Sequence, residues 1–261
     1  MGGIYLKMFR YIITSLIVIA ICTSCSKVGK REKKAYYANN EIGSIAYNVT
    51  NETNIVYLLE HDEYIPYIVI TNDYNGSTLL LRKNTLRDLY RYNDYNAYYR
   101  DSEIDNFLNT GFYHSLNKEV REIIEPVRIE ISSKDNFEMH GEIVEEYYTR
   151  VFLLSFEELN YGAKSSNTVA NEGKNLKFFD LPENRLAQNT NQISCAYWTR
   201  SADTGYSSCV FLVGRDGKIG SVNTYDLNGV RPAFCLSGKT PIIYQNNFIE
   251  GLSGYVLKTN Y

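Results

Sequence analysis

The stretch that decides the fold reads Trp198-Thr-Arg-Ser201, then Val210-Phe-Leu-Val-Gly-Arg-Asp-Gly217, then Gly229-Val-Arg-Pro-Ala233. Its runs are rich in aromatic and β-branched residues, which favour strands, and Arg215-Asp-Gly217 supplies the residues of a turn. Pro232 has no N–H to donate to a ladder, so we expect it at the edge of a sheet. The pattern predicts strands over residues 196–200, 208–213, 218–222 and 230–236.

A hairpin is predicted much nearer the N-terminus. Apolar runs over residues 55–59, 65–70 and 77–82 read as strands, and the Asn and Gly residues of 72–76 tolerate the positive φ angles of a tight turn. Pro66 indicates an edge strand, or the point where the chain enters the sheet, rather than a central position. We expect residues 198–233 to join this hairpin in one sheet and to leave polar loops at its rim.

The middle of the chain carries the signals of helices. Ile104, Phe107 and Leu108 lie on one helical face after the cap-like residues Asp101 and Ser102. Further helices are predicted over residues 117–124, 155–158 and 182–188, and further strands over 127–131 and within 142–154. Because strands at both ends enclose these helices, the sequence predicts a single α+β domain over residues 45–261.

These motifs resemble one known family. The pattern W-x-R-S…G…G-V-R-P-A, with Ser102-Glu-Ile-Asp-Asn-Phe-Leu-Asn109 and Val151-Phe-Leu-Leu-Ser155, is similar to an uncharacterised bacterial domain found on lipoproteins and secreted proteins. The resemblance covers about residues 55–236. That family is itself similar to the C-type-lectin-like fold, which includes the sulfatase-modifying enzymes that make formylglycine. The resemblance therefore implies a C-type-lectin-like mixed fold with short antiparallel sheets and a helical middle, and it says little about activity.

The first residues predict an export signal. Lys7 and Arg10 precede an apolar run over residues 11–21, which is shorter than the roughly 20 residues that a membrane-spanning helix needs. Small residues then lead into Cys25, as in the lipobox of bacterial lipoproteins. We expect a signal peptide over residues 1–24, a lipidated Cys25, and a flexible basic tether that completes residues 25–44.

Two alternatives to this anchor stay open. The signal is cleaved after a small residue without lipidation, or Cys22 carries the lipid, although bulky Ile21 before it makes that site less suitable. Translation starts at Met1 or at Met8, since either start leaves the charged and apolar parts intact. The lipid predicts a protein held on the cell membrane or outer membrane and facing outside the cytoplasm, with the membrane as its first partner.

Composition argues against a nucleic-acid partner. The chain has 27 Lys and Arg residues, and removal of Lys7 and Arg10 with the signal leaves 25 against 30 Asp and Glu, a net charge of −5. Surfaces that bind nucleic acid are normally basic and clustered. The chain also has 24 Tyr residues against one Trp, and exposed Tyr provides rigid contact area with a polar tip.

The sequence predicts no catalytic residues, no metal site and no cofactor. His61, His114 and His140 are scattered, and neither the Glu-Pro-Asn nor the Trp-Asn-Asp triplet of calcium-dependent lectins occurs. Polar residues lie near the C-terminal strands: Asp203, Asp216, Asn223, Asp226 and Asn228. They could provide oxygen ligands for a cation, but their usual role in turns explains them better.

The cysteines of the domain bear on the enzyme hypothesis. Cys195, Cys209 and Cys235 do not match the copper-binding motif of the formylglycine-generating enzymes, so that activity does not carry over. A Cys209–Cys235 disulfide and buried free thiols are the two alternatives, and free thiols are the commoner outcome for isolated cysteines.

We expect a non-catalytic recognition protein of the cell envelope whose ligand is a glycan, a peptide or an envelope protein. The alternatives are a diverged formylglycine-generating type of enzyme or a hydrolase that uses the same cleft, and a structural component of an envelope assembly. Trp198, Arg200 and Arg231 either build the fold, which their need for full pairing favours, or form walls of a ligand cleft. The candidate ligand-binding residues are Trp198, Arg200, Tyr206, Asn223, Tyr225, Asp226, Asn228 and Arg231.

Overall fold

The predicted N-terminal hairpin forms the middle of the largest sheet. In the computed structural model, which describes residues 40–48, 53–139, 142–162 and 168–258, β2 (Glu63–Tyr74) pairs antiparallel with β1 (Ile55–Glu60) and with β3 (Ser77–Arg82). The turn between β2 and β3 places Asn75 at φ 52° and Gly76 at φ 89°. These left-handed angles are the ones that Asn and Gly tolerate best, so the turn residues fix the hairpin.

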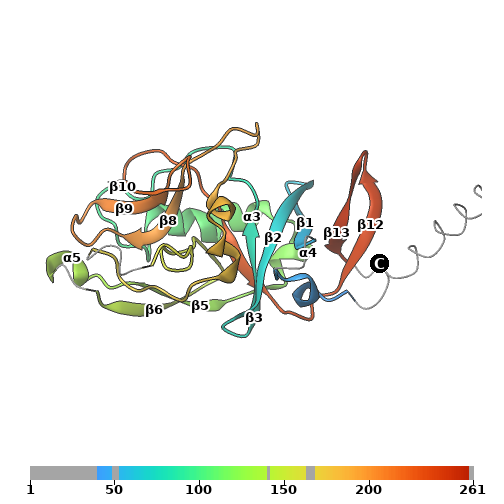
Figure 1. Cartoon of the computed structure of the whole chain (residues 1–261), viewed down its shortest axis with the longest axis horizontal. Coiled ribbons are helices and arrows are strands. Elements are labelled where there is room, and N and C mark those ends of the chain that lie inside the picture. Colours follow the sequence, from blue (N-terminus) through green and yellow to red (C-terminus); the bar gives the residue numbers. More distant parts are fainter. Residues whose placement is uncertain (1–39, 49–52, 140–141, 163–167, 259–261) are drawn as a thin grey trace, which may run out of the picture. The chain divides into compact units, whose positions relative to one another are not determined.

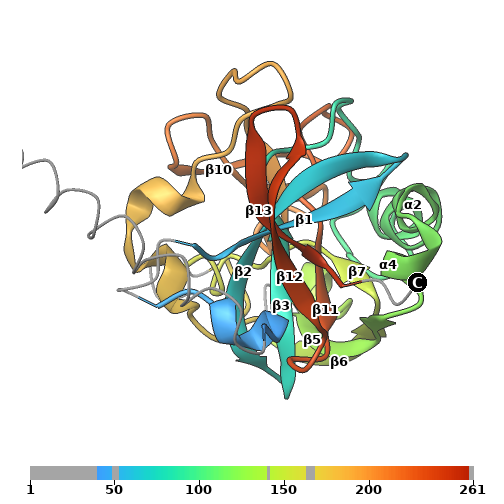
Figure 2. The same ribbon diagram turned by 90° about the vertical axis from the view of Figure 1, so that its right-hand side faces the viewer.

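Distant parts of the chain complete this sheet (Figure 2). Its strand order is β12-β13-β1-β2-β3-β11-β4, and β7 also pairs with β11. The sheet is mixed, because β1 and β13 run parallel while its other pairs run antiparallel. The added strands are β4 (Ile124–Glu125), β7 (Val151–Phe152), β11 (Ala233–Leu236), β12 (Ile242–Ile249) and β13 (Leu252–Leu257).

Two small antiparallel sheets lie at one end of this body, on the left in Figure 1. One has the order β10-β9-β8 and consists of β8 (Tyr197–Ala202), β9 (Cys209–Val213) and β10 (Ile219–Asn223). The other pairs β5 (Val127–Ser132) with β6 (Val144–Thr149). The prediction that residues 198–233 join the hairpin in one sheet is therefore right only at Ala233, where β11 begins to pair with β3, and wrong for β8–β10, which form a sheet of their own.

Helix is scarce, so the protein is mostly β and the predicted α+β fold with a helical middle needs correction. The main helix spans 13 residues and consists of α2 (Glu103–Phe107), a π-helical turn η3 (Leu108–Phe112) and α3 (Tyr113–Ser115). The remaining helices of the described residues are single turns: α4 (Lys118–Arg121), α5 (Asn136–Met139), and the 3₁₀ turns η2 (Ile42–Ile45), η5 (Lys177–Asp180) and η6 (Pro182–Arg185).

One local prediction, a helix from residue 155, fails, and the prediction for Pro66 agrees with the second of its two alternatives, the point where the chain enters the sheet. Residues 155–158 form the reciprocal bonds of a capping box, with Ser155 N donating to Glu158 Oε2 and Glu158 N to Ser155 Oγ, but only a turn follows. Pro66 lies in β2, which is flanked by strands on both sides instead of standing at an edge. Lys83 N donates to Pro66 O just beyond the end of β3, so the missing N–H falls where that pairing stops.

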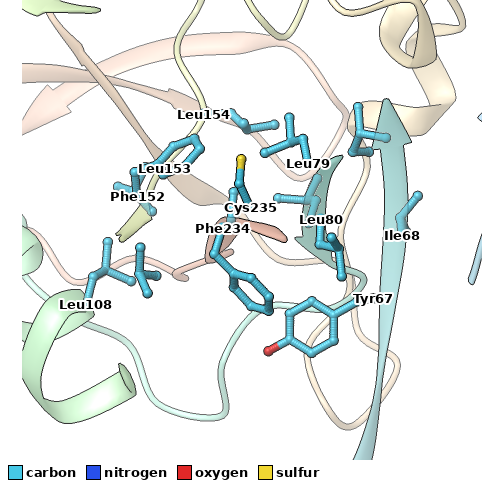
Figure 3. Packing of buried hydrophobic residues seen from close by; sticks show 14 of the residues in the cluster. Tyr67, Ile68, Leu79, Leu80, Leu108, Phe152, Leu153, Leu154, Phe234 and Cys235 are labelled. Atoms are coloured by element: carbon cyan, nitrogen blue, oxygen red, sulfur yellow. The ribbon is translucent and has the colours of Figure 1, made fainter. Parts of the chain in front are cut away.

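The core covers both faces of the large sheet at β3 and β11, because consecutive residues of these strands point to opposite faces and are buried (Figure 3). Phe234 and Cys235 of β11 are fully buried beside Leu79 and Leu80 of β3. Ile42 of η2 belongs to the same core, so residues 42–44 of the predicted flexible tether are packed against the domain.

The predicted signal peptide, the lipidated Cys25 and most of the basic tether lie outside the described residues. Within the described part of the chain, no helix combines the length and the apolar character needed to cross a membrane.

Candidate functional site

Three loops meet beside the β8–β9–β10 sheet and expose large side chains. They are the loop before α2, the loop between β8 and β9, and the loop after β10. Tyr95 is 85% exposed, Tyr206 67% and Tyr225 56%, which is unusual for aromatic side chains. We call the exposed residues of these loops the tyrosine rim: Leu89, Tyr95, Tyr206, Tyr225 and Leu227.

Backbone hydrogen bonds join the three loops. Tyr92 N donates to Thr224 O (2.8 Å), Ala97 N to Ser207 O (2.9 Å), and Thr224 N to Ser208 O (2.9 Å). The side chain of Asn93 also donates to Asn96 O (3.0 Å) and so closes the turn that carries Tyr95. Since each loop is tied to the other two, the rim is held in place before any ligand arrives.

Trp198 supports the rim from inside the protein. Its side chain is 1% exposed, and its indole Nε1 donates to Tyr90 O at 2.8 Å. The ring also meets Tyr92 edge-on at 5.7 Å between centroids, and Tyr92 Oη donates to Arg200 O at 3.1 Å. Trp198 therefore acts on the rim through the loop that it anchors and does not form part of the exposed surface.

Arg200 is the centre of a buried ion-pair network. Its Nη1 donates to Glu158 Oε2 (2.6 Å) and its Nη2 to Glu158 Oε1 (2.9 Å), in the two-pronged geometry that suits a guanidinium and a carboxylate. Both side chains are at most 1% exposed. Arg200 also donates to the carbonyls of Glu130 and Leu153, so most of its donors have partners and its burial is stabilised.

Glu172 lies beside this pair without a cation of its own. It accepts from Ser132 N (2.7 Å) and from Ser201 Oγ (2.5 Å) and is completely buried. Burial raises the pKa of Glu172 to about 7, although Arg200 and the bond from Ser201 act in the opposite direction. Its carboxyl group therefore titrates near neutral pH inside the protein.

Arg231 is the third buried residue of the sequence prediction. It is 2% exposed, its Nε donates to Arg82 O (2.9 Å), and its guanidinium lies over the ring of Tyr197. Arg231 thus ties β11 to the end of β3, near a second buried pair between Arg82 and Glu60. The burial of Trp198, Arg200 and Arg231 favours the structural role that the sequence suggested for them.

The other five predicted residues lie in or next to the rim. Tyr206 and Tyr225 are exposed, while Asn223, Asp226 and Asn228 are half-buried. The polar members are engaged in local structure: Asp226 N donates to Asn223 O, and Asn228 pairs with Tyr90. Whether these residues bind a ligand stays a prediction.

Among the described residues, no group of three or more His, Cys, Asp and Glu side chains comes together to hold a metal ion. Asp203 accepts from Ser221 Oγ and Gly205 N, and Asp216 accepts from Lys218 N, which is the turn chemistry that the sequence favoured. Cys195, Cys209 and Cys235 are free thiols, so the alternative of a Cys209–Cys235 disulfide is wrong.

Sequence reasoning missed part of the rim and part of the network. Tyr95 and Leu89 lie in an irregular segment, where periodicity gives no signal, but the local run of Tyr and Asn over residues 90–99 is itself a composition typical of a binding loop. Glu172 has no local signal, because its burial depends on strands far away in the sequence.

Comparison with known proteins gives one match. A family model described as "Domain of unknown function (DUF6273)" matches residues 75–238. This span begins at the turn between β2 and β3, ends after β11, and includes the whole tyrosine rim. No curated protein and no solved structure matches the chain.

Proposed function

Because the chain belongs to the DUF6273 family, which is defined by a domain of unknown function, we propose a role from the chain's own surface. The protein is a non-catalytic recognition protein of the cell envelope that binds a glycan at its tyrosine rim. The observation that carries this proposal is the set of three exposed tyrosines, Tyr95, Tyr206 and Tyr225, on three loops that are bonded to one another.

The chemistry of the rim suits a sugar. The flat face of a Tyr ring packs against the C–H groups of a pyranose, while its hydroxyl remains available for hydrogen bonds. Asn93, Asn223 and Asp226 lie next to these rings in the same loops and offer amide and carboxylate groups for sugar hydroxyls. The ordered loops reduce the conformational entropy that binding would otherwise cost.

Recognition explains the buried charges better than catalysis does. Arg200 and Glu158 are bonded to each other, and the Glu172 carboxylate is bonded to Ser132 N and Ser201 Oγ; all three residues are at most 1% exposed and lie outside the rim. Charged groups that satisfy each other in this way stabilise a scaffold.

The location and the finer fold belong to the same proposal. Cys25 is lipidated and holds the domain on the cell membrane or outer membrane, outside the cytoplasm. The architecture is C-type-lectin-like, which is supported by the return of the Gly229–Ala233 motif to pair next to the N-terminal hairpin. A lectin-like scaffold with loops presented at one end is consistent with the position of the rim.

A glycan array probed with the purified protein tests the proposed function. We expect binding to a restricted set of glycans and at least a tenfold loss when Tyr95, Tyr206 and Tyr225 are all replaced by Ser, since each lost stacking contact is worth about 0.5–1.5 kcal/mol. Tyr148→Ser is the matched control, because Tyr148 on β6 is also 67% exposed but lies outside the rim.

Two outcomes would count against the proposal. Absence of glycan binding above background, with capture of peptides or an envelope protein instead, would assign the rim to a protein ligand. Glycan binding that survives the triple substitution would place the sugar site elsewhere on the molecule.

A further inference from the structure

A polar cleft of about 670 Å³ lies apart from the tyrosine rim. It is lined by the end of β2, by β5, and by the segment 173–177, with Tyr47 and Glu158 completing it. Its volume falls within the range of about 300–1,000 Å³ that is usual for small-molecule sites. None of the rim residues lines it.

The floor of the cleft is fixed and electrically balanced. Glu158 is held by Arg200, and Tyr74 Oη donates to Glu158 Oε1 at 2.5 Å. Burial and the neighbouring Glu158 raise the pKa of Tyr74, so its hydroxyl keeps its proton. The floor therefore has the rigidity that a preformed site requires.

Gly173 lets the segment 173–177 approach this floor. Its φ is +93°, and a Cβ at this position would lie 2.9 Å from Glu158 Oε1. Gly173 N also donates to Glu130 Oε2 at 2.9 Å, which ties the segment to β5. The wall of the cleft thus depends on Gly173, because any other residue at this position would strain the backbone.

Charges of both signs line the cleft. Arg128 of β5 is neutralised by its ion pair with Glu146, while two lysines and two carboxylates from different segments form no ion pair with one another. Lys174 and Lys177 are exposed on the segment 173–177, whereas Asp73 belongs to β2 and Glu130 to β5. No ion pair joins either lysine to either carboxylate among the residues that the structure describes. Unpaired lysines are ordinary at a surface, but here both lysines and both acidic residues line one cavity, and one carboxylate oxygen of Glu130 accepts from Gly173 N.

We propose that this cleft binds a small zwitterionic molecule with a free ammonium and a free carboxylate group, as in an amino acid or a short peptide with unblocked ends. Lys174 and Lys177 bind the carboxylate, and Asp73 and Glu130 bind the ammonium group. A purely anionic ligand would meet Asp73 and Glu130, and a purely cationic one would meet the two lysines, so each would be repelled by one wall. The amide of Asn72 provides an uncharged partner for a peptide group.

Calorimetric titration of the full-length protein in detergent, with free amino acids and with di- and trialanine, tests this proposal. We expect at least one of these probes to bind, and about a tenfold loss of affinity when its amino group is acetylated or its carboxylate is amidated. The double variant Lys174→Gln/Lys177→Gln and the single variant Asp73→Asn should each lose about tenfold. Lys83→Gln is the control, since Lys83 is an exposed lysine outside the cleft.

Three results would overturn the proposal: no binding of any probe, equal binding of the blocked and the unblocked peptides, or unchanged binding by the double lysine variant. The outcome is separate from the glycan proposal, because Tyr206→Ser should leave binding in the cleft unchanged. Loss of zwitterion binding in Tyr206→Ser would place the peptide at the rim and contradict the cleft assignment.

Discussion

At the scale of single residues, one guanidinium organises the interior. Arg200 comes from β8, Glu158 from the turn after β7, and Glu172 from the segment that leads to the polar cleft. The sequence motif marked Arg200 as a residue that needs complete pairing, but it did not identify the partners. In the sequence, Glu158 could be identified only as half of a capping box. Its ion pair with Arg200 could not be predicted, because it depends on the tertiary fold.

Glu172 makes the stability of the protein depend on pH. Its pKa rises from an ordinary value of 4.5 to about 7 in the folded protein because it is buried. Between these two pH values the folded protein retains a proton that the unfolded chain releases, so the free energy of unfolding falls as the pH rises from about 4.5 to about 7. The stability that the protonated Glu172 contributes is fully present below pH 4.5 and is lost above pH 7. The total change in the free energy of unfolding is on the order of 3 kcal/mol.

Glu172→Gln should remove this pH dependence, because Gln keeps an oxygen acceptor for Ser132 N or Ser201 Oγ but does not titrate. Urea unfolding at a series of pH values across the window measures the effect. The free energy of unfolding should fall with pH in the wild type and much less in the variant. Glu183→Gln, at an exposed position, should behave as the wild type. A variant Glu172→Gln with the full wild-type slope would show that another group titrates.

At the scale of elements, the strands were predicted better than the helices. Residues 55–59, 77–82 and 127–131 alternate or carry apolar runs bounded by turn residues, and each forms a strand. The helical patterns were real but short: residues 117–124 give one turn, because β4 begins at Ile124 and pairs with β11. Pairing with a distant strand outweighed the local preference for helix, and that competition is not visible in a single sequence.

The loop that carries Tyr95 is tied to the core by the side chain of Trp198. Trp198→Phe removes the N–H that Tyr90 O accepts while keeping an aromatic ring in the core. We expect amide exchange over residues 90–97 to become faster and the free energy of unfolding to drop by about 1 kcal/mol, because Tyr90 O loses the indole donor and keeps only the bond from Asn228 N. Amides of β9 should change less, since their partners in β8 and β10 remain.

Hydrogen exchange followed by mass spectrometry resolves this difference. Tyr148→Phe on β6 provides the control and should leave exchange in both regions unchanged. Uniformly faster exchange in Trp198→Phe would mean that the tryptophan stabilises the whole domain instead of supporting the rim loop. Glycan affinity should fall together with the protection of that loop, which links this element to the proposed function.

At the scale of the whole molecule, the sheet is assembled from segments that are far apart in sequence. β11 pairs with β3, β4 and β7, and β13 pairs with β1 at the opposite end of the chain. The family match over residues 75–238 excludes both β1 and β13, which pair with each other. Periodicity predicted most of these strands without their order in the sheet, because it carries no information on which distant segments pair.

The hairpin of β12 and β13 was not predicted, although its signals are present. Asn247 and Gly251 adopt positive φ angles of 52° and 75° around the turn, as Asn and Gly do in many hairpins. The polar run Gln245-Asn-Asn247 interrupts the apolar pattern of β12, and the pairing register shifts at this place. An irregular strand of this kind is hard to recognise from alternation, because the alternation itself is broken.

The proposed attachment of the molecule to a membrane rests on one side chain, that of Cys25. Cys25→Ala should abolish incorporation of a labelled fatty acid in a bacterial host and should move the protein from the membrane to the soluble fraction, because no lipid can then be attached. Cys22→Ala is the matched control from the same motif, and it should keep both the label and the membrane fraction. Loss of label in Cys22→Ala alone would assign the lipid to Cys22. If Cys25→Ala stays in the membrane fraction, and neither the wild type nor this variant carries the label, the lipid anchor is contradicted.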